Sequence, residues 1–143
     1  MMQRLEKERL LREMYEARIR NDFDAISDFF APDMHYHMMG SPDGRGQIIQ
    51  AAGLDEFRPL TEQFMKTFVL SDLHIRNVVI EGEKAVVHWQ VRMQSGSTGD
   101  VALTDLCDII EFKNDRIVSF VEFCDTALAG RFMRGSALAG KLQ

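Results

Sequence analysis

The alternation of apolar and polar side chains between Lys84 and Gln94 constrains the fold more than any other feature of this chain. Every second position of the segment is apolar, at Ala85, Val87, Trp89, Val91 and Met93. Successive side chains of a β-strand point to opposite faces of its sheet, so this pattern predicts a strand with one buried face. A sheet with one apolar face needs a second layer to cover that face.

Three other segments of the second half are also expected to be strands. One follows Leu70 and ends near the turn residue Gly82, and the others are Val101–Phe112 and Arg116–Cys124. Each is separated from the next by a short stretch rich in glycine, serine, asparagine or aspartate, which is typical of turns. Strands joined by such short turns are antiparallel neighbours, so we expect the four to form a curved antiparallel meander.

The first half of the chain has helical rather than strand periodicity. In its first segment Leu11, Met14 and Tyr15 fall on one side of a helix. The four expected helices are one that contains Leu11–Ile19, one over Phe23–Phe30, one over roughly Leu54–Phe68 and one around Ala127–Met133. A single aromatic-rich strand, His35–Met39, stands between the second and third helices. The predicted fold class is therefore α+β, with the helices covering one face of the sheet.

Length and composition narrow the class of protein. The chain has 143 residues, 45% of them apolar and 27% charged, which is ordinary for one folded domain, and we expect residues 1–143 to form a single one. Its formal net charge of −5 is unlike that of nucleic-acid-binding proteins, which carry a basic surface. No apolar run approaches the roughly 20 residues of a membrane span. Since no cleavable signal is apparent either, the cytoplasm is the expected compartment.

Three segments carry a recognisable pattern. Residues 21–37 combine a short helix, an acidic residue and an aromatic strand, residues 53–57 start a helix, and residues 112–125 form a closing hairpin. Together they resemble SnoaL-like proteins of the nuclear transport factor two-like superfamily, over roughly residues 8–134. The resemblance implies a cystatin-like cone, in which a curved sheet wraps around helices and an apolar pocket opens at one end. It also implies a homodimer formed through the outer face of the sheet.

Members of this superfamily include isomerases, dehydratases, epoxide hydrolases and polyketide cyclases, so the resemblance does not select one reaction. Ketosteroid isomerases carry a tyrosine and two aspartates at positions that hold Met14, Met38 and Asp108 here. Tyr15 is one residue away from the tyrosine position, which is a rotation of about 100° around a helix. SnoaL cyclases and phenazine-biosynthesis proteins carry an acidic acid/base group on the last strand, which implies that role for Glu122.

The register of the last hairpin decides whether two carboxyl groups meet. If residues 113–115 form a three-residue loop, Asp108 and Glu122 are diagonal neighbours on one face of the sheet, about 7–8 Å apart. If Asn114 and Asp115 form a two-residue turn, the two acids lie on opposite faces. We prefer the first register because it surrounds the acids with more apolar residues.

Two carboxyl groups in an apolar cavity repel each other and are poorly solvated. One of them then holds a proton near neutral pH while the other accepts one. We expect Glu122 to be the proton acceptor and Asp108 to be a protonated donor to a developing oxyanion. The alternative is structural: one of the two acids faces solvent or a partner, or pairs with a buried histidine.

Aromatic, apolar and sulfur-containing side chains are expected to line the pocket. Flexible methionine side chains suit an adaptable apolar surface, and the chain has nine methionines. The predicted wall residues are Tyr15, Tyr36, Met38, Phe57, Phe64, Phe68, Trp89, Met93, Leu106, Phe120 and Cys124.

The sequence does not decide which side chains of the first strand point into the protein. His35 and His37 lie two residues apart and share one face, a spacing that can bind a metal. No third ligand is evident and the two cysteines lack metal-ligand spacing, so we expect no metal and no cofactor. If Tyr36 and Met38 point inward, the histidines point outward. If the orientation is reversed, either histidine is a candidate proton shuttle.

Two kinds of function fit these observations. The first is a cofactor-independent acid/base catalyst, an isomerase, dehydratase or cyclase, that acts on a small apolar substrate. The second is a non-catalytic, dimeric ligand-binding or interaction module. In both cases the expected partners are a small apolar molecule and a second copy of the chain, with no nucleic acid and no membrane.

Overall fold

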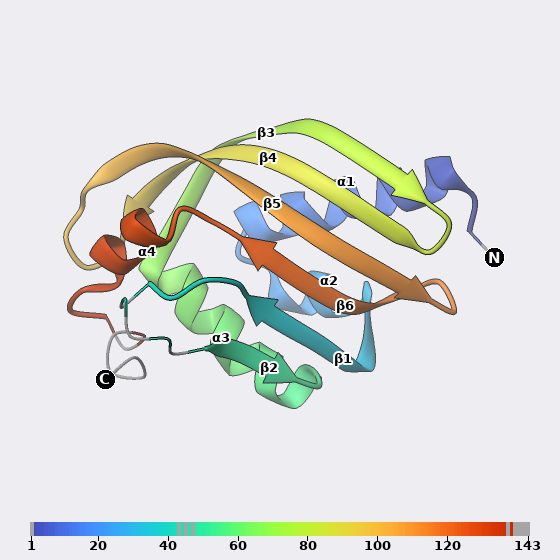
Figure 1. The fold of residues 1–143 in the computed structure, drawn as a ribbon, viewed down its shortest axis with the longest axis horizontal. Coiled ribbons are helices and arrows are strands. Elements are labelled where there is room, and N and C mark those ends of the chain that lie inside the picture. Colours follow the sequence, from blue (N-terminus) through green and yellow to red (C-terminus); the bar gives the residue numbers. More distant parts are fainter. Residues whose placement is uncertain (1, 43, 45, 47, 137, 139–143) are drawn as a thin grey trace.

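Four helices and six strands form the part of the chain that the computed structural model describes, which is residues 2–42, 44, 46, 48–136 and 138. In chain order they are α1 (Arg4–Ile19), α2 (Phe23–Ser27), β1 (Phe30–Met38), β2 (Ile49–Ala52), α3 (Leu54–Thr67), β3 (Phe68–Glu81), β4 (Lys84–Ser95), β5 (Val101–Lys113), β6 (Arg116–Phe123) and α4 (Thr126–Met133) (Figure 1). None of these helices is long and apolar enough to cross a membrane.

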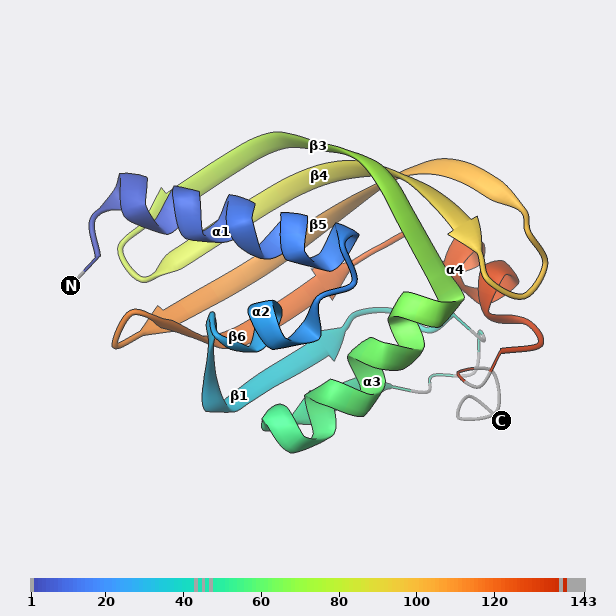
Figure 2. The same cartoon turned by 180° about the vertical axis from the view of Figure 1, so that it is seen from behind.

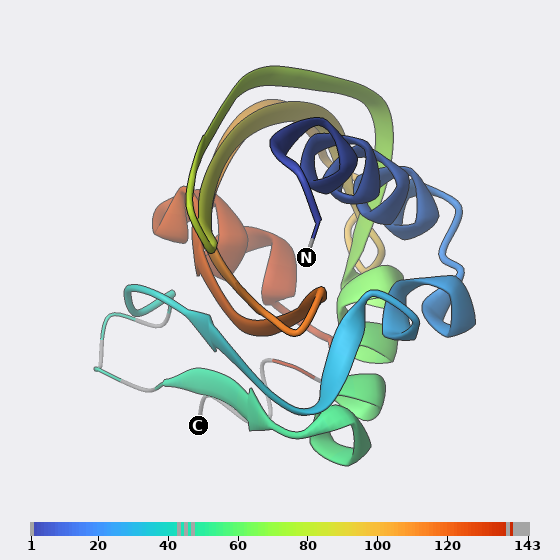
Figure 3. The same ribbon diagram turned by 90° about the vertical axis from the view of Figure 1, so that its right-hand side faces the viewer.

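The six strands make one curved sheet in the order β2-β1-β6-β5-β4-β3. Strands β3 to β6 form the predicted antiparallel meander, while β1 pairs with β6 in parallel and β2 pairs with β1 in antiparallel orientation. Helices α1, α2 and α3 lie on the concave side of the sheet (Figure 2), and the sheet curls around them (Figure 3). The predicted α+β class and the cone shape are confirmed.

Local sequence signals explain where the helices begin. The side chain of Asp22 accepts a hydrogen bond from the backbone N–H of Ala25 and caps α2, and Asp125 caps α4 in the same way. The second helix is shorter than predicted and ends at Ser27. It stops there because Phe30 already pairs with Ile117 as the first residue of β1.

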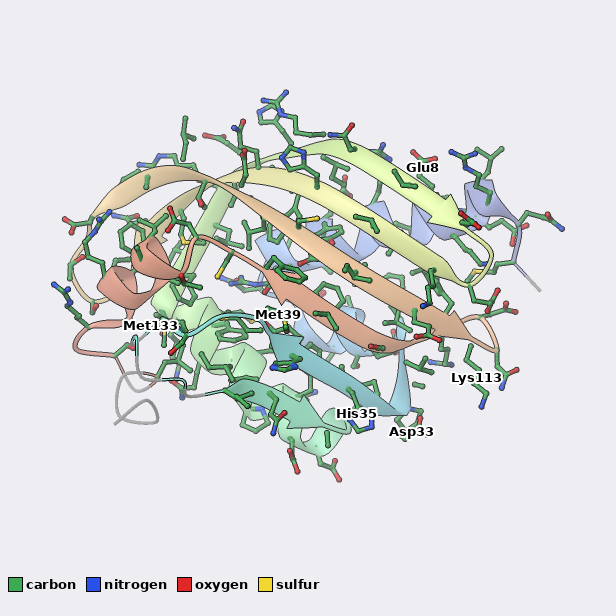
Figure 4. All side chains as sticks on the ribbon, in the orientation of Figure 1. Glu8, Asp33, His35, Met39, Lys113 and Met133 are labelled. Carbon is green, nitrogen blue, oxygen red and sulfur yellow. The ribbon has the colours of Figure 1, made fainter. Side chains whose placement is uncertain are left out.

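The strands bury the residues that the alternation selects. All five apolar residues of β4 in the predicted set are buried. The polar residues that alternate with them are only partly covered, at His88, Gln90, Arg92 and Gln94. In β1 the side chains of Tyr36 and Met38 point inward and are buried. His35 is exposed on the outer side of this strand (Figure 4), and His37 is half-buried on the same side. The first of the two orientations therefore holds, and neither histidine reaches the interior.

Two features of the sheet were not predicted. Strand β1 begins at Phe30 rather than at His35, and the short strand β2 follows residues that were expected to form only a loop. Both depend on partners that are remote in sequence, because β1 pairs with β6 and β2 exists only as an edge beside β1. Local periodicity cannot report such pairings.

The turn between β5 and β6 differs from the preferred prediction. Asn114 and Asp115 both adopt positive φ, 52° and 64°, which is the backbone of a two-residue hairpin turn. Lys113 therefore pairs with Arg116, and the three-residue loop is wrong. Both residues are of the type that tolerates the left-handed region, so the sequence was compatible with either turn.

A β-bulge then changes the register beyond the turn. Phe112 pairs with Ile117 but Glu111 pairs with Ser119, so Val118 is an extra residue in β6. The shift places Asp108 directly opposite Glu122 rather than diagonal to it. The two-residue turn alone would have put the acids on opposite faces, and the bulge returns them to the same face.

Candidate functional site

A cavity of about 860 Å³, its open mouth included, lies between the concave face of the sheet and the helices. Residues of α1, α2 and α3 line one side of it, residues of β1 and of β3 to β6 line the other, and α4 covers one end. Every residue that the sequence predicted for the pocket lines this cavity: Tyr15, Tyr36, Met38, Phe57, Phe64, Phe68, Trp89, Met93, Leu106, Phe120 and Cys124. Whether they contact a ligand stays a prediction.

The wall also contains polar residues that the sequence reasoning missed, foremost Arg18 and Thr61. Both follow from helical spacing. Arg18 continues the stripe of Leu11 and Tyr15 on α1, and Thr61 lies four residues after Phe57 on α3. They were missed because only apolar and acidic side chains were considered for the pocket.

Asp108 lies behind the cavity wall. Its side chain is completely buried and is not among the residues that line the cavity. Its Oδ2 accepts a hydrogen bond from the hydroxyl of Tyr15 at 2.5 Å and one from Nε1 of Trp89 at 2.8 Å. The predicted role of a direct donor to the substrate does not fit this position, because Tyr15, Trp89 and Glu122 separate Asp108 from the cavity.

Glu122 is the carboxyl group that faces the cavity. It is half-buried and forms part of the wall. The hydroxyl of Tyr36 donates a hydrogen bond of 2.8 Å to its Oε1, and Asp108 lies directly opposite on the neighbouring strand. A carboxylate offers about four acceptor positions, so the bond from Tyr36 orients Glu122 and leaves others open to the cavity.

Burial raises the pKa of Asp108 well above its ordinary value of 3.8, and the neighbouring Glu122 raises this pKa further, whereas the bonds from Tyr15 and Trp89 lower it. Oδ1 of Asp108 has no donor among the described residues. A proton on Oδ1 satisfies this atom and lets Asp108 donate to Glu122.

The two tyrosines of the network remain protonated donors. Burial raises the pKa of Tyr15 well above its ordinary value of 10.0, and Asp108 raises it further. Burial likewise raises the pKa of Tyr36, with Glu122 as the second cause. Neither hydroxyl therefore loses its proton near neutral pH.

The contact between Tyr15 and Asp108 corrects the position that the resemblance implied for the helix tyrosine. The alignment put Met14 there and treated Tyr15 as rotated away. Both residues are buried and both line the cavity, because the buried face of α1 is wider than the rotation between neighbours. Met38, which stands where the resemblance expects an aspartate, pairs directly with Glu122.

Arg18 brings a positive charge to the same cavity. Its Nη2 donates to the backbone oxygens of Phe64 at 3.4 Å and Phe68 at 3.1 Å, and its Nη1 donates to Oδ1 of Asn21. Burial lowers the pKa of Arg18 to about 10, while Glu122 opposes that change. The guanidinium thus stays charged at neutral pH and balances the charge of Glu122.

Metal ligands do not gather in the described part of the chain. No three side chains of histidine, cysteine, aspartate or glutamate come together there as a metal site would require. Cys107 and Cys124 are both free thiols. Burial raises the pKa of Cys124 to about 12, so this wall residue is a thiol rather than a nucleophilic thiolate at neutral pH.

Comparisons with known proteins agree with this architecture. The sequence profile of the SnoaL-like domain matches residues 11–120. No protein of curated function resembles the chain at a significant level.

Solved structures with the same fold include three from bacteria. An NTF2-like protein of unknown function from Burkholderia pseudomallei is 24% identical, with 90% of this chain and 97% of that chain covered and a TM-score of 0.74. A provisionally named isomerase from Bacillus subtilis is 18% identical, with 90% and 92% covered and a TM-score of 0.76. AclR, a provisionally named hydroxylase from Streptomyces galilaeus, is 19% identical, with 98% and 97% covered and a TM-score of 0.67. At these identities the likeness concerns the fold alone.

Proposed function

The chain belongs to the SnoaL-like family, and we propose that it is a cofactor-independent acid/base catalyst for a small, mostly apolar carbonyl compound. The observation that supports this most is the position of Glu122. It is a carboxyl group at the wall of an apolar cavity, directly opposite a buried acid whose pKa is raised by burial. Two neighbouring carboxyl groups, one protonated and one ionised, can act as a general acid and a general base at neutral pH.

Glu122 would remove a proton from the carbon next to the carbonyl group. The electrons of the broken C–H bond move into the C–O unit, which becomes an enolate, and the proton is held by the glutamate oxygen. If a C=C bond is conjugated with the enolate, return of the proton to its far carbon isomerises the substrate. If a hydroxyl group lies on the β carbon, it leaves as water with that proton as the C=C bond forms, and if the enolate carbon attacks a second carbonyl group, the new alkoxide takes the proton and a ring is closed.

Asp108 would act as a positioning residue rather than a catalytic one. It lies directly opposite Glu122 and would act on the substrate only through that residue, while Tyr15 and Trp89 donate hydrogen bonds to it. A neutral acid in this place keeps Glu122 charged without a second negative charge beside it. The phenol of Tyr36 fixes the other side of the carboxylate.

The proposal is tested by exchange of the C–H protons of 2-tetralone, 2-indanone and cyclohexanone with D₂O, followed by ¹H NMR. The native protein is expected to accelerate exchange of at least one ketone, and Glu122→Gln to lower that rate by about 10²- to 10⁴-fold. Glu111→Gln, the same substitution on the exposed outer face of β5, serves as the control. Full activity of Glu122→Gln would contradict the proposal. Ketone binding without accelerated exchange would favour the non-catalytic ligand-binding module.

A homodimer through the outer face of the sheet is a further proposal, supported by an apolar stripe across three strands. Val86 of β4 pairs with Ile109 of β5, which pairs with Val121 of β6. Val86 and Ile109 are exposed, as is Phe123 nearby on β6. Sedimentation equilibrium of the native protein and of Ile109→Glu tests the proposal, which predicts a dimer that the charged variant dissociates.

A further inference from the structure

The proton transfer creates negative charge on the carbonyl oxygen, and a catalytic cavity needs a donor for that oxygen. The most obvious donors are already in use, because Tyr15, Trp89 and Tyr36 each donate to one of the two carboxyl groups. In the described part of the wall, the donors without such a partner are the hydroxyls of Thr61 and Thr104, part of the guanidinium of Arg18 and the thiol of Cys124.

Thr61 stands out among these groups. Its side chain is 4% exposed, and its Oγ1 has no hydrogen-bond partner among the described residues. A threonine inside a helix commonly donates to the carbonyl four residues earlier, and Thr61 does not. A buried hydroxyl without a partner destabilises the ligand-free protein, so the position is one that a ligand atom would satisfy.

The guanidinium of Arg18, which comes from α1, contacts α3 about one helical turn beyond Thr61. It donates to the backbone oxygens of Phe64 and Phe68, and Phe64 follows Thr61 by about 5 Å along the helix axis. With the bond to Asn21 included, three of its five N–H groups have partners among the described residues. Two N–H groups remain for a ligand at the cavity wall.

Thr61 and Arg18 come from the helical side of the cavity, and Tyr36 and Glu122 come from the sheet. The ring of Tyr36 packs against Phe57 at 5.4 Å and Phe64 at 5.8 Å between ring centroids, and Thr61 lies between these two positions on α3. The hydroxyl of Tyr36 holds Glu122. Tyr36 therefore contacts Glu122 through its hydroxyl and, through its ring, the two aromatic residues of α3 on either side of Thr61.

We propose that the hydroxyl of Thr61 and the unused N–H groups of Arg18 form the oxyanion site for the reaction proposed above. The inference rests on that function and adds the groups that receive the charge. When the C–H bond breaks, the proton goes to Glu122 and the electron pair to the carbonyl oxygen, which accepts hydrogen bonds from Thr61 and Arg18.

The charges of the site then define the substrate class. Before transfer, the interior of the cavity holds the carboxylate of Glu122 and the guanidinium of Arg18, while the third charged residue of the lining, Asp125, is exposed and caps α4. After transfer, the glutamic acid is neutral and the enolate takes the place of the negative charge, so the sum of the charges in the interior does not change. A neutral ketone or related carbonyl compound fits this balance. A substrate that is already a carboxylate would leave one negative charge without a partner in an apolar cavity.

The kinetic test compares Thr61→Val with Thr67→Val in the 2-tetralone exchange assay. Thr67 is buried on the same helix but is not part of the cavity wall, so it controls for the substitution itself. Loss of one oxyanion donor is expected to lower kcat by about tenfold or more while KM changes little, because the interaction forms fully only with the enolate. The control is expected to stay within about twofold of the native rate.

A binding test needs no turnover. 2-Naphthol presents a polar oxygen to the site, whereas 2-methylnaphthalene has the same shape without it. Thr61→Val is expected to weaken binding of 2-naphthol by about tenfold and to leave the hydrocarbon unchanged. Thermal unfolding shows that the variant folds, and removal of the unpartnered hydroxyl is expected to raise its Tm in the absence of ligand.

The outcomes separate the two proposals. If Glu122→Gln stops exchange while Thr61→Val has the native kcat, the base is right and the oxyanion site is wrong. A loss of kcat in Thr104→Val but not in Thr61→Val overturns the oxyanion site in the same way. If Glu122→Gln remains fully active, the proposed function fails. In that case selective loss of 2-naphthol binding still supports Thr61 as the group that recognises a ligand oxygen.

Discussion

Substitution of Asp108 by asparagine gives the sharpest test of the carboxyl pair. An asparagine has the same shape as a protonated aspartic acid, and its amide oxygen can accept the bonds from Tyr15 and Trp89. Its NH₂ group can donate to Glu122 as the acid does. Asp108→Asn is therefore a permanently neutral version of the buried acid, without the proton that the native side chain must keep.

The sign of the pH effect follows from the raised pKa of Asp108. Between the ordinary value of 3.8 and the raised folded-state pKa, the folded protein keeps a proton on Asp108 that the unfolded chain has lost. The stabilisation is complete below about pH 4 and is lost as the pH rises toward the folded-state pKa. The free energy of unfolding then falls by about 1.4 kcal/mol per pH unit relative to Asp108→Asn. The relative loss accumulates over the whole interval between the ordinary pKa and the raised folded-state pKa.

The assay is urea unfolding of the native protein and of Asp108→Asn at pH 5, 6, 7 and 8. Asp33→Asn, an exposed substitution on β1, controls for the loss of an ordinary carboxylate. We expect the stability difference between Asp108→Asn and the native protein to grow with pH in favour of the variant, and that of the control to stay nearly constant. A difference that does not change from pH 5 to pH 8 would refute the protonated state of Asp108.

Three other substitutions probe the frame of the cavity. Lys7→Met removes a buried ammonium group that donates to the carbonyl of Gly82 at 2.7 Å, and should lower the unfolding free energy in urea by about 1.5–3 kcal/mol. Gly96→Ala brings a Cβ into the carbonyl oxygen of Lys66, where backbone must move, and should destabilise by about 1–3 kcal/mol, seen as a lower Tm. Phe57→Ala removes a buried ring from the wall and should cost about 3–5 kcal/mol in the same urea assay, whereas an unchanged midpoint would show that the wall does not support the fold.

Local patterns in the sequence were sufficient for most of the architecture. The alternation in β4 selected the buried face at Trp89 and its neighbours, and helical spacing selected the buried stripe of α1. The period of apolar residues predicts the buried face because one face of each strand or helix must be covered in the folded protein. For the same reason the predicted aromatic wall residues lie along the cavity.

The arrangement of the polar groups depended on tertiary structure. A bulge at Val118, which no local pattern announced, placed Asp108 opposite Glu122. The cone then enclosed Asp108 behind the wall, and it left the hydroxyl of Thr61 without a hydrogen-bond partner in the described part of the chain. The charge state and donor capacity of these groups depend on atoms contributed by remote parts of the chain. Periodicity reports only which side of an element is covered, whereas hydrogen bonding and desolvation are set by what covers it.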